Sequence, residues 1–165
     1  NNWLPEILLA KGMSAVTAGY WAAIPSAIGV VGALIIPQFA TPSRRIPMLA
    51  VLFCAALSAS LLMQLAPGVF LVSGLVLQGI ARGAMMTIAI LLLMETPSVP
   101  PERLGLAGGM FFTAAEVGGV LGPVTFGVLS AASGAFTLPL ASLTVVCMLL
   151  LLVLSRLRRL ERGVF

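Results

Sequence analysis

The sequence contains no histidine and no aspartate, and charged residues make up only 8% of its 165 positions. Without these two residue types the chain cannot form a Ser-His-Asp or Cys-His catalytic centre, or a histidine-rich metal site. A nucleophile motif of the Gly-x-Ser-x-Gly kind is also missing. We therefore expect that the chain is not an enzyme and that it holds no metal ion and no other cofactor.

Cysteine and free charge are equally scarce. The two cysteines, Cys54 and Cys147, lie inside apolar runs, where a cysteine behaves as a small hydrophobic residue. The net charge is +4, from nine basic and five acidic residues, but the basic residues occupy short connections between apolar runs. That placement is typical of loops on one side of a membrane. We expect no nucleic-acid partner.

What the chain does contain is apolar sequence. Hydrophobic residues make up 60% of it and charged residues only 8%, whereas a soluble domain carries about 25% charged residues. About 20 apolar residues cross the roughly 30 Å hydrocarbon core of a bilayer. The sequence predicts an all-α, multi-pass membrane protein with one transmembrane bundle over residues 1–165. Its five complete spans are residues 15–39, 48–65, 70–94, 105–130 and 136–154.

The first fourteen residues are too short to form a span. We predict that they comprise the end of a sixth, upstream helix and an interfacial segment, because Trp3 and Lys11 flank a short apolar patch. The chain begins with Asn-Asn-Trp, without a charged signal region, and we expect it to be part of a larger protein.

Basic residues predict the orientation of the bundle. When the five spans alternate in direction, Lys11 falls on one side and seven arginines fall on the opposite side. The positive-inside rule makes the side with the arginines cytoplasmic. The basic cluster after residue 154 is expected to anchor the bundle at lipid headgroups. The arginines on this side are Arg44, Arg45, Arg103, Arg156, Arg158, Arg159 and Arg162.

The fourth span is rich in glycine. Gly105 and Gly109 are four residues apart, as are Gly118 and Gly122. This spacing places small residues on one helix face, so that a neighbouring backbone can approach closely. Pro123 follows directly and is expected to bend the helix. We predict that this helix is packed against a neighbour.

Two charges lie deep inside predicted spans. Arg82 lies about 18 Å from the cytoplasmic end of the third span, and Glu116 lies about 16 Å from that of the fourth. A charge at the bilayer centre costs about 2.5–3.5 kcal/mol on the insertion scale, so neither side chain is expected to face lipid. Gln78 and Thr113 lie about one turn before the two charges and could add hydrogen bonds.

Two interpretations of this pair compete. In the first, Arg82 and Glu116 form a buried ion pair that fixes how the third and fourth spans dock. In the second, Glu116 changes its protonation as the site alternates in exposure, and Arg82 binds an anionic group. The second interpretation makes all four polar residues candidates for a substrate or coupling site.

These patterns resemble a known family. The series Gly109, Gly118, Gly122 and Pro123, followed by Phe126-Gly127, is similar to the antiporter motif of the major facilitator superfamily. The whole chain is similar to the C-terminal half of such a transporter, from the end of the seventh helix through the twelfth.

Three further segments carry the resemblance or depart from it. Residues 77–83 are similar to the family's conserved-arginine helix, but Leu75 stands where its arginine is expected, so Arg82 does not inherit that role. The connection that ends in Arg44 and Arg45 is similar to the family's signature loop on the cytoplasmic side, without its aspartate. The opening Trp-Leu-Pro is similar to cyanate-permease-type members, while the glycine motif is similar to drug or metabolite antiporters.

The resemblance implies two six-helix bundles with a substrate between them near the midplane. The third and fourth spans would then line the cavity, and the second and fifth would face lipid. It implies part of a secondary active transporter that moves a small metabolite, anion or drug-like solute by alternating access, coupled to protons, in the cell inner membrane. Its partners would be the solute, protons, the lipid bilayer and the N-terminal half. The alternative is a non-transporting membrane subunit or assembly protein whose glycine motifs serve packing alone.

Overall fold

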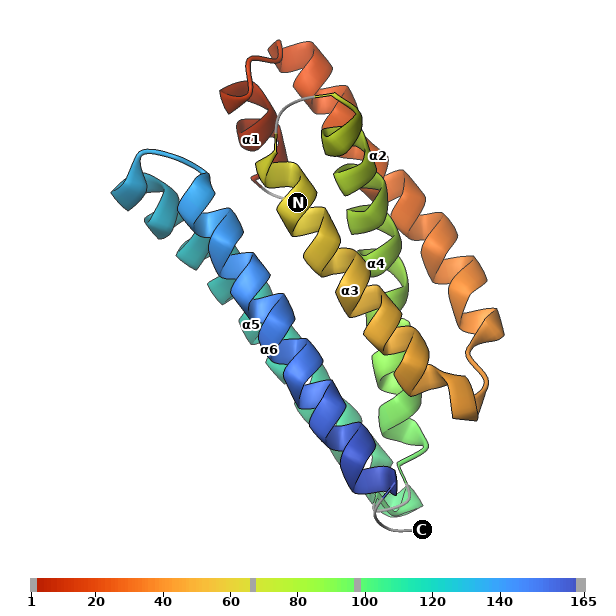
Figure 1. Ribbon diagram of the computed structural model, residues 1–165. Helices are drawn as coiled ribbons and strands as arrows, with labels where there is room; N and C mark the ends of the chain where they lie inside the picture. The colour runs from red at the N-terminus through yellow and green to blue at the C-terminus, as the bar shows by residue number, and fades with distance from the viewer. Residues whose placement is uncertain (1–2, 66–67, 97–98, 163–165) are drawn as a thin grey trace.

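The computed structural model describes residues 3–65, 68–96 and 99–162, with side chains as far as Arg159. Every regular element in these residues is helical (Figure 1). Five helices are long and apolar enough to cross a membrane, as the sequence predicted. The helices are α1 (Leu4–Ala10), α2 (Ala15–Ile35), α3 (Arg45–Gln64), α4 (Val69–Met94), α5 (Leu104–Ser133) and α6 (Thr137–Arg162), with single 3-10 turns at Ile36–Phe39, Pro42–Arg44 and Pro101–Arg103.

Several helices extend beyond the predicted spans. Helix α3 begins at Arg45, three residues before the predicted start, because Pro47 lies in the first turn, where a missing N–H breaks no intrahelical bond. Helix α6 continues past residue 154 to Arg162 because arginine, leucine and glutamate favour helix in water as well as in lipid. Helix α5 ends at Ser133, and Gly134 follows with a φ of 64°, the left-handed conformation common after helix ends.

Helix α4 is the centre of the bundle. It packs along both α2 and α3, and α3 also packs against α6. Helix α5 contacts α6 and, over a shorter stretch, α4, so it lies at the side of the bundle (Figure 1). Phe126 is the one buried residue of α5. Most of the surface of α5 is therefore uncovered by the residues that the structure describes.

The closest helix contact is between α2 and α4. A Cβ atom added to Gly79 would lie 2.7 Å from the carbonyl oxygen of Pro25, and one added to Gly83 would collide with the backbone of Gly29. Only glycine permits two backbones to come this close. A close glycine contact of the kind expected on α5 thus occurs between α2 and α4, and the one expected on α5 stays a prediction.

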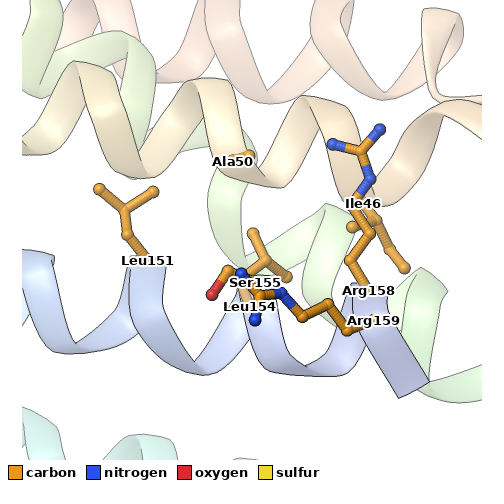
Figure 2. A pocket seen from close by; sticks show the side chains of 7 residues that line it. All are labelled: Ile46, Ala50, Leu151, Leu154, Ser155, Arg158 and Arg159. Atoms are coloured by element: carbon orange, nitrogen blue, oxygen red, sulfur yellow. The ribbon is translucent and has the colours of Figure 1, made fainter. Parts of the chain in front are cut away.

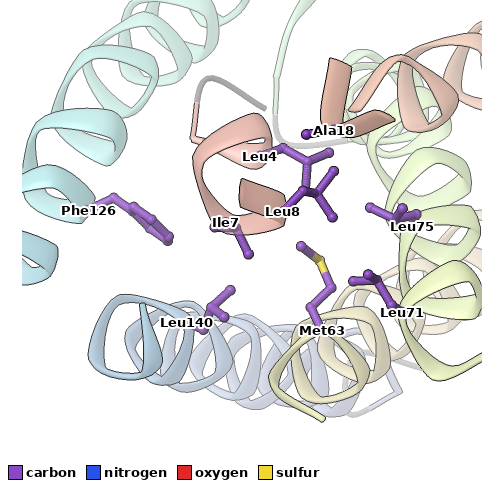
Figure 3. Packing of buried hydrophobic residues seen from close by; sticks show 9 residues of the cluster. All are labelled: Leu4, Ile7, Leu8, Ala18, Met63, Leu71, Leu75, Phe126 and Leu140. Carbon is purple, nitrogen blue, oxygen red and sulfur yellow. The ribbon is translucent and has the colours of Figure 1, made fainter. Parts of the chain in front are cut away.

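Helix α1 lies inside the bundle. Leu4, Ile7 and Leu8 are buried in one cluster with side chains of α2, α3, α4, α5 and α6 (Figure 3). The end of an upstream helix was predicted within residues 1–14, and α1 is a short helix there whose apolar residues recur at helical spacing and pack into the core. The interfacial segment stays a prediction. Lys11 follows the helix and donates a hydrogen bond to the carbonyl oxygen of Leu65, 2.7 Å away.

A polar network joins α3 to α6. The hydroxyl groups of Ser60 and Thr144 lie 2.8 Å apart, and the Ser60 hydroxyl also lies 3.0 Å from the carbonyl oxygen of Leu140. The amide nitrogen of Gln64 donates to the Thr144 hydroxyl at 3.2 Å. In an apolar surrounding, such bonds hold two helices in one register.

The two neighbouring arginines at the start of α3 differ sharply. Arg44 is exposed, whereas Arg45 is buried and forms an ion pair with Glu95 at the end of α4. The Arg45 guanidinium also donates to the carbonyl oxygens of Ala40, at 3.0 Å, and Leu91, at 3.2 Å. Arg45, predicted to lie in a loop, is thus the first residue of α3 and connects three segments.

Replacing Arg45 with glutamine should lower the free energy of unfolding by about 2–3 kcal/mol, because two carbonyl oxygens lose a charged donor and Glu95 loses its partner. Glu95 is half exposed, so water screens part of the lost attraction. The matched control is Arg44→Gln, which should change stability by no more than about 0.5 kcal/mol. Denaturant titration in mixed micelles measures both. Equal losses in the two variants would contradict the contacts described for Arg45.

Candidate functional site

One face of α4 runs from the core to open surface. Leu71, Leu75, Gln78 and Arg82 follow one another at spacings of three or four residues, so they lie on one side of the helix. Leu71 and Leu75 are buried in the cluster that contains α1. Gln78 is half-buried and Arg82 is exposed. Helix α1 therefore covers the first turns of this face and leaves Arg82 uncovered.

One face of α5 has the same arrangement. Gly109, Thr113, Glu116, Pro123 and Gly127 share this face by their spacing. The indole nitrogen of Trp3, just before α1, donates to the carbonyl oxygen of Pro123 at 3.0 Å. A Cβ atom added to Gly127 would lie 2.7 Å from the Trp3 ring. The other three residues of the face are exposed.

Helix α1 gives the two charges a common reference point. Arg82 follows Leu75 by seven residues, and Glu116 precedes Pro123 by seven. At 1.5 Å per residue, each charge lies about 10 Å along its helix from a residue that contacts α1 or Trp3. Because α4 and α5 run in opposite directions, both charges lie on the same side of α1. This agrees with the similar depth that the sequence analysis predicted.

The two charges do not form an ion pair in this structure. Within the described side chains, the ion pair between Arg45 and Glu95 is the only one. Arg82 and Glu116 are both exposed. The hydroxyl of Thr113 donates to Gly109 in its own helix, at 2.8 Å. The buried ion pair of the first interpretation is therefore not formed, and both charges are accessible to a ligand or to another polypeptide segment.

A comparison with protein families decides the class of this bundle. The family model of the Major Facilitator Superfamily (MFS) matches residues 1–164, nearly the whole chain. The chain belongs to the major facilitator superfamily. It is a multi-pass integral membrane protein of a transporter family. Searches of curated proteins and of solved structures found no match.

Most glycines of the motif on α5 in this MFS chain have no described neighbour packed against them. A Cβ atom added to Gly109, Gly118 or Gly122 would meet nothing within 4 Å. Among the described residues, no helix covers that part of α5, so the close packing expected at these glycines stays a prediction. Gly127, the last residue of the motif, is the exception, since it lies against Trp3.

The uncovered face of α5 carries a shallow hollow, widely open to the outside, of about 510 Å³. Helix α5 alone supplies its lining, which places the hollow at the edge of the described bundle. Thr113, about one turn before Glu116, and Gly109, about two turns before it, both lie in it. The lining residues are Gly105, Leu106, Gly109, Met110, Thr113 and Ala114.

Three features of the bundle were not predicted from the sequence. Gly79 and Gly83 have the same four-residue spacing as the glycines of α5, so a signal for their role was present. Trp3 was noted as an interfacial aromatic residue, but its contact with Pro123 joins positions 120 residues apart. The partner of Arg45 had no signal in local spacing, because Glu95 lies fifty residues away.

Proposed function

We propose that this MFS chain is the C-terminal half of a secondary active transporter in the cell inner membrane. The transporter moves a small metabolite, anion or drug-like solute by alternating access, and protons drive it. One observation carries the proposal: the faces of α4 and α5 that extend beyond α1 are open, and each presents one charge, Arg82 or Glu116. Charged residues inside membrane spans characteristically mark the path of a substrate or ion.

Each polar residue has a part in this mechanism. Arg82 binds the anionic group of the solute, since a guanidinium presents paired donors to carboxylate or phosphate. Glu116 carries the proton. In the conformations that place its side chain in a low-dielectric environment, a neutral carboxyl group costs far less free energy than a carboxylate. Gln78, half-buried beside Arg82, supplies a further hydrogen bond, and Thr113 supplies its oxygen as an acceptor near Glu116.

The uncovered face of α5 leaves room for a polypeptide partner as well as for a solute. We propose that the N-terminal half of the transporter lies against this face and completes the wall of the cavity. The open glycines Gly109, Gly118 and Gly122 permit a close approach of that partner. The similarity to cyanate-permease-type members and to drug or metabolite antiporters suggests which solutes to test first.

The test uses the full-length protein in proteoliposomes that contain a pH-sensitive dye. Cyanate, small carboxylates, phosphate esters and ethidium are added in turn, with and without an imposed proton gradient. The proposal requires at least one of them to move protons on addition and to accumulate only while the gradient lasts. Empty liposomes and a protonophore are the controls. If none of these solutes is transported, none causes proton movement, and the upstream sequence lacks six further spans, the chain is a non-transporting membrane subunit.

A further inference from the structure

A second hollow lies between the start of α3 and the end of α6, far from Arg82 and Glu116 in the sequence. Its volume is about 320 Å³, roughly ten times the 30 Å³ that one water molecule occupies in the liquid. Ile46, Ala50, Leu151 and Leu154 form an apolar part, while Ser155, Arg158 and Arg159 form a polar part (Figure 2).

The apolar part belongs to the core of the bundle. Leu154 is only 5% exposed and lies in a buried cluster with side chains of α3 and α4. Ile46, Ala50 and Leu151 are half-buried and pack against the same cluster. The wall on this side is therefore fixed by packing.

The charge of the polar part comes from two arginines. Arg158 reaches from α6 toward α3 beside Ile46, and Arg159 runs back along α6 toward Ser155 (Figure 2). Both arginines are exposed. Neither has an ion pair or a hydrogen bond to any side chain that the structure describes. Two positive charges therefore face one hollow without a counter-charge from the described residues.

The hollow lies at the level where the apolar sequence ends. The predicted fifth span stops at residue 154, and α6 continues as the basic helix that carries both arginines. Arg44, exposed just before the start of α3, lies at this same end of the bundle and adds to its positive charge. A ligand that fits here has an anionic group and an apolar part next to it. This is the chemistry of a phospholipid with a net negative headgroup, and a free phosphate ion would leave the apolar wall empty.

We propose that this hollow binds one anionic phospholipid. Its phosphate lies between Arg158 and Arg159, which can each donate two hydrogen bonds to phosphate oxygens. The first carbons of an acyl chain lie against Ile46, Ala50, Leu151 and Leu154. The bound lipid joins the start of α3 to the end of α6. This site is separate from the proposed solute site, and its test does not depend on transport.

Native mass spectrometry of the full-length protein measures the binding. The purified protein is titrated with phosphatidylglycerol and, separately, with phosphatidylcholine, and the first bound lipid is counted. We expect the wild type to bind phosphatidylglycerol more tightly. The double variant Arg158→Gln/Arg159→Gln should bind it about thirtyfold more weakly, since each arginine near the membrane surface contributes about fivefold and the two factors multiply. Circular dichroism verifies that the variants remain helical.

The matched control removes the same charge at the same end of the bundle. Arg103→Gln/Arg156→Gln neutralises two exposed arginines that do not line the hollow, and its affinity for phosphatidylglycerol should stay within about twofold of wild type. If this control loses as much affinity as the test variant, the lipid is attracted by diffuse charge and the site does not exist. Equal wild-type affinity for the two lipids would overturn the proposal in the same way.

A third variant separates a lipid from a soluble anion. Ala50→Phe places a ring in the hollow and leaves both arginines unchanged. Phosphatidylglycerol affinity should fall at least tenfold, while any binding of inorganic phosphate, measured in parallel, should not change. If the lipid binds Ala50→Phe as well as it binds wild type, the apolar wall is not part of the site and the proposal is wrong.

Discussion

Replacing Glu116 with glutamine should abolish solute accumulation driven by a proton gradient and leave solute binding intact. Glutamine has nearly the same shape as glutamate but cannot take up or release a proton, so the variant loses the coupling step alone. In proteoliposomes, the ratio of internal to external solute should fall to one under a gradient that drives accumulation in the wild type. Exchange of labelled for unlabelled solute, which needs no net proton movement, should persist.

The control for this result is Glu102→Gln. Glu102 is an exposed acid in the turn Pro101–Arg103, outside the apolar part of α5, and the substitution changes the charge by the same amount. Driven accumulation in this variant should equal that of the wild type. If Glu102→Gln also loses accumulation, the effect follows the net charge of the protein and does not locate the coupling group.

Arg82→Gln distinguishes the roles of the two charges. If the solute is an anion, this variant should bind it roughly ten- to a hundredfold more weakly, the equivalent of one charged hydrogen bond of about 1.5–3 kcal/mol. A contrary pattern would restore the ion-pair interpretation. In that pattern each single variant misfolds, and the double variant Arg82→Gln/Glu116→Gln regains both expression and driven transport.

The five spans were predictable because the requirement is simple. In lipid, each backbone N–H and C=O must be bonded within the segment, so an apolar run of about 20 residues has few alternatives to helix. The ends of the spans were harder to predict. Hydropathy marks where lipid stops, whereas α6 continues through Arg158 to Arg162 because these residues also favour helix.

The candidate site was predictable in its residues but not in its surroundings. The cost of a charge in lipid is enough to single out Arg82 and Glu116 from the sequence. The covering of their helix faces by α1 was not predictable, because Trp3 and Pro123 are 120 residues apart and no local pattern joins them. Arg82 and Glu116 do not form an ion pair because of where α5 lies in the bundle. The spacing of residues along the sequence does not determine that position.

The glycines show the same limit in another form. Gly79 and Gly83 on α4 have the same spacing as Gly118 and Gly122 on α5. The first pair lies against α2, and the second meets open space within this chain. A four-residue spacing predicts a face that permits close approach, but the partner depends on the order of the helices in space. The contact of the α5 motif with a partner segment therefore remains a prediction.

The largest effect on folding should come from Gly83→Leu. A Cβ atom at this position collides with the backbone of Gly29, and backbone cannot move aside as a flexible side chain can. Inserting bulk into a packed core costs about 1–3 kcal/mol when side chains can adjust. Here two helices must separate, so we expect a loss of at least about 3 kcal/mol, seen as aggregation during purification or as a collapse of the thermal transition.

Gly19→Leu is the control on the opposite helix of the same contact. Gly19 lies in α2, and a Cβ atom there would meet nothing within 4 Å. The substitution also removes a glycine from a helix, which by itself favours the helix by up to about 1 kcal/mol. This variant should therefore be at least as stable as wild type. If Gly83→Leu unfolds no more readily than Gly19→Leu, α2 and α4 do not approach through their backbones, and the centre of the bundle must be arranged differently.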